Sequence, residues 1–214
     1  MKTKRHKSGS VRPWLIGLMM AVLLVAGTLG AGALGLWRQD IPKDPVRVEN
    51  NCELPFQYIG MAWEGHCLLY KTDTSPVRQA VFPKAVLKDV QAVRLLAVTD
   101  DQQILTSGFV PLDAEEPLLI EGVNGERLKV KNAEPADEEM PLPKLPGLDA
   151  WEVSGDAKQA KVAYQAGMGM SYQIYVLGRG GHIGASGWTS PGGNAEASWE
   201  RGRGPVMSWL MFNY

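Results

Sequence analysis

Histidine and cysteine, the side chains that most often perform catalysis or bind metals, are scarce in this sequence of 214 residues. It has three histidines and two cysteines, and only His66 and His182 lie outside the N-terminal tail. Neither histidine belongs to a catalytic motif, and without a Cys-x-x-Cys pair the sequence holds no complete set of zinc ligands. We therefore predict that the protein is not an enzyme and that it holds no metal ion or other cofactor.

Charged residues are also missing from the stretch between Arg12 and Arg38. Segment 14–37 of this stretch is almost wholly apolar and has a tryptophan at each end. As a helix it would be about 36 Å long, enough to cross a hydrocarbon core of about 30 Å. Tryptophan side chains prefer the headgroup level of a bilayer. We predict that 14–37 is a transmembrane helix that contacts the lipid bilayer.

Small residues recur on one face of this expected helix. Gly27, Ala31 and Gly35 are spaced four residues apart, so they would let a second transmembrane helix approach closely. Glycine is also common in membrane spans without such a contact, and the sequence leaves both interpretations open.

The orientation of the span follows from its flanking charges. The tail 1–13 contains five basic residues and no acidic one, whereas the charges from Arg38 onward roughly cancel near the span. By the positive-inside rule the N-terminus is cytoplasmic and the C-terminal region lies outside. The sequence contains no Asn-x-Ser/Thr sequon, which favours a bacterial envelope. We predict a single-pass protein of the bacterial inner membrane with a periplasmic or extracellular C-terminal region.

A cleaved secretory signal is the alternative. The triplet Ala31-Gly32-Ala33 near the end of the apolar run matches a signal-peptidase site. The two tryptophans and the full apolar length favour the uncleaved anchor, because a signal needs only a shorter apolar run. In both cases the remainder of the chain is exported.

The exported part is acidic. Six of the 22 Lys and Arg residues precede residue 39, so 16 basic residues stand against 23 acidic ones, a net charge of about −7. Nucleic-acid binding depends on basic side chains that neutralise phosphates. We therefore expect no nucleic-acid partner.

The two cysteines, Cys52 and Cys67, both belong to the exported part. In an oxidising compartment such a pair is most simply a disulfide. It would close a short loop and add about 3 kcal/mol to the free energy of unfolding. We predict this disulfide.

Short segments with the alternation of β-strands fill region 46–132, which follows a spacer over 38–45. Three β-hairpins are expected, around 64–66, 99–103 and Asn124-Gly125, since Asn-Gly accommodates the positive φ of a tight turn. The sequence predicts a mainly β fold, built as small β-sandwich or barrel-like modules.

A linker rich in proline and acidic residues, 133–148, separates this region from a second one at 149–214, rich in Gly and Trp. The last strand of this second region, 206–214, is apolar on both faces, so it is either central in a sheet or covered by another protein. Indole rings and guanidinium groups are interleaved in this region and together suit a partner surface. The candidate partner-binding residues are Arg179, His182, Trp188, Trp199, Arg201, Arg203, Trp209, Phe212 and Tyr214.

A membrane tether followed by β modules resembles, in layout only, the scaffold subunits of bacterial envelope assemblies for secretion, pili or division. We expect a non-enzymatic envelope protein of this kind, whose second β region meets a membrane or envelope protein. The alternative is a stand-alone extracytoplasmic module that binds or inhibits a glycan, a lipid or an exported toxin.

Overall fold

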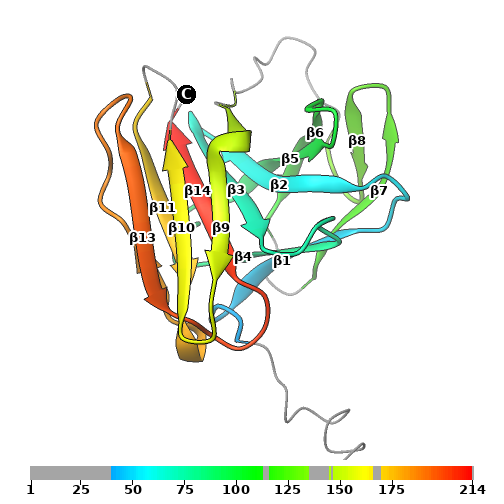
Figure 1. Ribbon diagram of the computed structural model, residues 1–214. Coiled ribbons are helices and arrows are strands. Elements are labelled where there is room, and N and C mark those ends of the chain that lie inside the picture. The colour runs from blue at the N-terminus through cyan, green and yellow to red at the C-terminus, as the bar shows by residue number, and fades with distance from the viewer. Residues whose placement is uncertain (1–39, 113–115, 135–144, 146, 166–169, 214) are drawn as a thin grey trace, which may run out of the picture. The chain divides into compact units, whose positions relative to one another are not determined.

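A computed structural model of the protein describes residues 40–112, 116–134, 145, 147–165 and 170–213 (Figure 1). The predicted transmembrane helix at 14–37, with its small-residue face, lies outside these residues, as do most of the predicted linker and Tyr214. Among the residues that are described, no helix is both long and apolar enough to cross a membrane.

The described residues fold mainly into β-strands, which confirms the predicted mainly β class. Two short 3-10 helices, η1 (Leu148–Ala150) and η2 (Arg179–Gly181), accompany them. The strands are β1 (Pro45–Asn50), β2 (Phe56–Trp63), β3 (His66–Thr72), β4 (Gln79–Pro83), β5 (Ala92–Thr99), β6 (Ile104–Pro111), β7 (Leu118–Asn124), β8 (Arg127–Val130), β9 (Trp151–Gly155), β10 (Gln159–Gln165), β11 (Tyr172–Leu177), β12 (Ile183–Ala185), β13 (Asn194–Glu200) and β14 (Met207–Asn213).

Eleven of these strands form one long sheet, in the order β12-β11-β14-β3-β2-β5-β6-β8-β7-β1-β4. The pairs β1–β7 and β6–β8 are parallel, and the other neighbours are antiparallel. The sheet curls so far that Trp209 in β14 donates its indole N–H to the carbonyl of Val81 in β4, at 2.7 Å. The result is a nearly closed, barrel-like sheet (Figure 1).

The three predicted hairpins are present, as β2–β3, β5–β6 and β7–β8. The first turns at Glu64 and Gly65, both with positive φ, and the third turns at Asn124-Gly125, where Gly125 has a φ of 62°. In β8 the two apolar residues are buried and the two basic residues are exposed. The alternation in the sequence therefore assigns the faces of this strand correctly.

One hydrophobic core fills the inner side of the curled sheet, and we call it the barrel cluster. Alternate residues of β2, β3 and β5 point into it, and the first half of β14 adds Met207 and Trp209. Its fully buried members include Ile59, Met61, Leu68, Phe82, Leu95 and Trp209.

A second core, which we call the sandwich cluster, forms on the other face of β2, β3, β5, β11 and β14. A separate three-stranded sheet, in the order β13-β10-β9, covers this face, and in Figure 1 it lies in front of β14. Trp151 and Tyr164 from the small sheet pack there with Leu210 and Phe212 from β14. The two layers bury the apolar faces that each sheet would otherwise expose to water.

Strand β14 is central, with β11 on one side and β3 on the other. Met207 and Trp209 belong to the barrel cluster, whereas Leu210 and Phe212 belong to the sandwich cluster. This double burial explains why the strand is apolar on both faces. Because β3 comes from the predicted region 46–132 and β14 comes from the second region, the two regions share one sheet.

The predicted disulfide between Cys52 and Cys67 is not formed, because both residues are free thiols. Cys67 is fully buried in the sandwich cluster, and this burial raises its thiol pKa well above the ordinary value. Cys52 instead packs against the barrel cluster, with its sulfur beside the side-chain oxygen of Asn50. The sheet separates the two thiols. The prediction was wrong because spacing along the chain does not show which face of a sheet each cysteine occupies.

Replacing Trp209 by alanine should lower the free energy of unfolding by about 3–5 kcal/mol. The indole is fully buried, packs against the ring of Tyr70 and donates a hydrogen bond to Val81. Denaturant unfolding of the full chain in detergent, followed by circular dichroism, measures the change. The control is Trp188→Ala, because Trp188 is 47% exposed and its removal leaves no cavity. Equal stability of the two variants would contradict this assignment of the core.

Candidate functional site

We call the folded part of the chain that the structure describes, from Asp40 to Asn213, the body. Strands β3 and β14 run antiparallel along it and define its two ends. At one end Thr72 pairs with Met207, and at the other His66 pairs with Asn213. Seven residues at about 3.4 Å each place these ends roughly 20 Å apart. The first described residue, Asp40, donates its backbone N–H to a carbonyl near Met207. We therefore call the Thr72 end the entry end and the His66 end the distal end.

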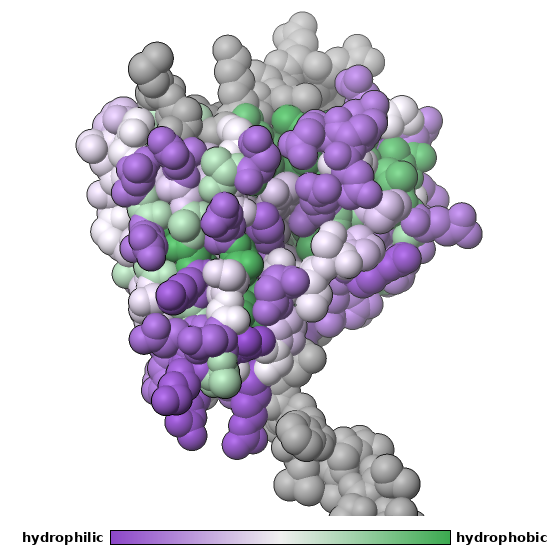
Figure 2. All heavy atoms as spheres, in the orientation of Figure 1, coloured by the Kyte–Doolittle hydropathy of each residue, from purple (hydrophilic) through white to green (hydrophobic). Residues whose placement is uncertain are grey.

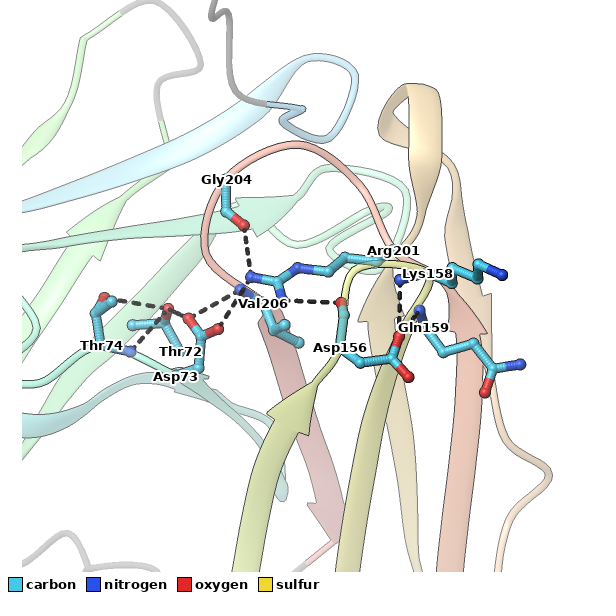
Figure 3. Close-up of polar contacts among 9 residues, drawn as sticks. All are labelled: Thr72, Asp73, Thr74, Asp156, Lys158, Gln159, Arg201, Gly204 and Val206. Atoms are coloured by element: carbon cyan, nitrogen blue, oxygen red, sulfur yellow. Dashed lines mark hydrogen bonds and ion pairs between the residues drawn. The ribbon is translucent and has the colours of Figure 1, made fainter.

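Arg201, between β13 and β14, connects the two sheets at the entry end (Figure 3). Its guanidinium donates to the carbonyls of Asp156, at 3.0 Å, and Gly204, at 3.3 Å. It also lies 3.5 Å from Oδ2 of Asp73, whose other carboxylate oxygen, Oδ1, accepts the backbone N–H of Val206 at 2.9 Å. The Arg201 and Asp73 side chains are 27% and 23% exposed, so water screens this ion pair only in part.

Asp156 shapes the turn between β9 and β10. Its Oδ1 accepts the backbone N–H groups of Lys158, at 2.7 Å, and Gln159, at 2.8 Å (Figure 3). These hydrogen bonds lower the pKa of Asp156, because they favour the charged form of the carboxyl group. The turn is joined to Arg201, whose backbone N–H donates to the Lys158 carbonyl at 2.8 Å. Lys158 is thereby placed beside the arginines that follow β11 and β13.

A groove of about 470 Å³ opens at this end, and we call it the basic groove. Figure 2 shows that this lower end of the face, where β13 finishes, is covered mainly by hydrophilic residues. Two small residues, Ala157 and Gly202, line the groove between its charged side chains. Four basic residues and one acidic residue complete the lining: Lys158, Arg179, Arg201, Arg203 and Glu200.

The four cations of the groove differ in how they are paired. Arg179 lies 2.8 Å from Glu200, and this hydrogen bond and opposite charge raise the pKa of Arg179. Arg201 is engaged as described above. Within the described part of the chain, the side chains of Lys158 and Arg203 make no hydrogen bond or ion pair. These two cations are therefore available to an anion.

The groove unites three of the candidate partner-binding residues from the sequence, namely Arg179, Arg201 and Arg203. Sequence reasoning missed Lys158, because only the pairing of β10 with β13, which sets Gln159 opposite Glu200, brings the two loops together. The residues of β10 and β13 do not indicate that these two strands pair with each other.

The other candidates lie elsewhere. His182 is exposed just beyond η2, and Trp199 is half-buried with its indole directly over Gly184, where a Cβ atom would clash. Trp209 and Phe212 are fully buried in the two cores. Tyr214 lies outside the described residues.

The distal end carries a larger cavity, of about 640 Å³, which we call the distal pocket. Trp63 and Phe109 supply aromatic lining. His66 is positioned by two contacts, since its Nδ1 lies 2.7 Å from Oδ1 of Asn213 and its ring centroid lies 5.8 Å from that of Trp63. Three exposed charged residues of both signs also line the pocket, namely Glu64, Lys88 and Asp89, together with Val90, Gln91 and Ala92.

Trp188 lies at the distal end as well. The neighbouring Thr189 donates its N–H to the carbonyl of Tyr172 at 2.9 Å, and Tyr172 pairs with Phe212 near the end of β14. An indole that is 47% exposed is thus held by a loop that is hydrogen-bonded to the sheet.

No three His, Cys, Asp or Glu side chains converge on a possible metal site within the part of the chain that the structure describes. Comparisons with models of protein families, with curated proteins and with solved structures gave no match. The function is therefore inferred from the two ends of the body.

A double-mutant cycle on Arg201→Gln and Asp73→Asn should give a coupling free energy of about 1 kcal/mol, at the upper end for pairs near the surface. The reason is that both side chains are mostly shielded from water and the pair joins the two sheets. Denaturant unfolding of the four full-length forms measures it.

The matched control is the Arg179–Glu200 pair, whose side chains are 70% and 66% exposed and whose coupling should be too small to measure. If the two cycles gave the same coupling, Arg201 would not be the link between the sheets.

Proposed function

We propose that this protein is a non-enzymatic, single-pass envelope protein of the bacterial inner membrane, and that its distal end binds a protein partner. The observation that supports this proposal best is the placement of the chain entry at Asp40 and of the aromatic distal pocket at opposite ends of β3 and β14. A body held to a membrane at its entry end keeps its distal end free for a partner.

The distance along the chain supports attachment at the entry end. The expected span ends at Trp37, three residues before Asp40, and three residues reach at most about 11 Å. Asp40 is itself fixed, because its backbone N–H donates to the Arg203 carbonyl at 3.0 Å and its carboxylate accepts the Arg203 N–H at 2.7 Å. A membrane that holds Trp37 would therefore hold the entry end of the body close to its surface.

The chemistry of the distal end suits a protein partner. Trp63 and Phe109 supply aromatic side chains to a recess whose other lining is mixed polar and apolar, and recesses of this kind receive the anchor side chains that dominate binding. Lys88 and Asp89 at the rim carry opposite charges, which select a partner by charge complementarity. Trp188 adds an indole whose loop is already ordered, so little conformational entropy is lost when it is covered.

The test is co-purification of the full chain from native membranes in a gentle detergent. A defined set of envelope proteins should accompany the wild-type chain and be lost when Trp188→Ala is combined with Lys88→Glu. The control is Val123→Ala, which removes exposed apolar surface from β7, outside the lining of the distal pocket. It should retain the whole set.

Two results would overturn the proposal. One is the same set of proteins with all three forms, since the distal end would then have no part in binding. The other is a chain that brings down no protein but pellets with isolated cell wall after salt washing, which would favour the stand-alone glycan-binding module.

A further inference from the structure

We infer that the basic groove binds the phosphate groups of anionic phospholipids in the membrane that anchors the chain. This inference rests on the proposed membrane anchoring and adds a lipid-binding surface to it. The charge of the groove is the first reason. The exported part has a net charge of about −7, yet four of the five charged residues that line this groove are basic.

The second reason is that the start of the described chain packs against one residue of the groove, Gly202, and against η2, the short helix that begins with Arg179 of the groove. Asp40 approaches Gly202, where an added Cβ would lie 3.0 Å from its carboxylate oxygen. Ile41 approaches Gly181, which has a φ of +80° and where a Cβ would lie 2.5 Å from the Ile41 carbonyl. Any side chain at Gly181 would push the entering chain away from η2. The fold thus fixes the entering chain beside the groove.

The third reason is the reach of the chain. At most about 11 Å separate Trp37 from Asp40, and the headgroup layer on each side of a bilayer is itself several ångströms thick. Arg203 is bound directly to Asp40. If Trp37 sits at the headgroup level, as its amphipathic ring prefers, the groove lies within reach of the lipid phosphates.

The available side chains determine the ligand. Glu200 is engaged by Arg179, and the Asp40 carboxylate is engaged by the Arg203 backbone. Lys158 and Arg203 keep their side chains unpaired within the described residues. An ammonium group and a guanidinium group that line the same groove suit a phosphate, which the guanidinium can bind with two hydrogen bonds. Phosphatidylglycerol, with one net negative charge, supplies that group at the membrane surface.

The experiment uses the full chain in lipid nanodiscs made of phosphatidylcholine alone or of phosphatidylcholine mixed with phosphatidylglycerol. Hydrogen exchange is followed by mass spectrometry in peptides that cover 156–159 and 201–205. Phosphatidylglycerol should slow exchange of both segments in the wild-type chain. Lys158→Gln combined with Arg203→Gln should abolish that difference, and each substitution alone should weaken the affinity for phosphatidylglycerol about fivefold.

The matched control is Lys84→Gln combined with Lys129→Gln, which removes two exposed lysines outside both the basic groove and the distal pocket and should keep the full effect. A second arm adds inorganic phosphate to nanodiscs of phosphatidylcholine alone. If free phosphate protects the two segments as well as phosphatidylglycerol does, the groove is a site for soluble phosphate and the assignment to lipid is wrong. If the control pair lost the protection by phosphatidylglycerol to the same extent, the lipid site in the basic groove would also be refuted, because the net charge of the protein alone would then explain the protection.

Carbonate extraction of native membranes separates this inference from the proposed function. If the chain resists extraction but its hydrogen exchange is the same in both kinds of nanodisc, the proposed anchoring stands and the lipid site is refuted. A chain that carbonate releases refutes the anchoring, and the lipid site with it.

Discussion

The pairing of β14 with β3 is the contact on which the rest of this structure depends. It places residues 207–213 between two neighbouring strands of the long sheet, where Trp209 packs in the barrel cluster and Phe212 in the sandwich cluster. The two cores therefore share a strand, and neither can form fully without it. The same pairing sets the loop before β14 at one end of the body and the end of β14 at the other, so it also fixes where the two cavities lie.

At the entry end, Arg201 holds the two sheets together beside a charged surface. Its guanidinium joins the loop after β3 to the turn before β10 through two hydrogen bonds and one ion pair. Lys158 and Arg203 are consequently held beside it without being paired to it. Structural pairing of one cation thus leaves two neighbouring cations for a ligand, and it does so next to Asp40, where the chain enters the body.

Local signals in the sequence predict the hairpins well, because Asn124-Gly125 and the alternation of β8 act over neighbouring residues. The two apolar faces of β14 likewise indicate a covered strand. Features that depend on pairing between distant strands are not predictable in this way. Strand β13 has only alanines and one tryptophan on its buried side, too weak a signal to mark it. The false disulfide and the missed Lys158 have the same origin, since sequence spacing gives neither the face nor the partner of a strand.

The central claim is that the entry end faces the membrane and the distal end points away from it. Quenching by lipids with a spin-labelled headgroup tests this most directly, with a fluorophore on Ala157→Cys or on Ser190→Cys in a Cys52→Ser background of the reconstituted full chain. Both positions are exposed, one at each end. The account predicts strong quenching at position 157 and little at position 190. Equal quenching at the two positions, or stronger quenching at 190, would contradict it.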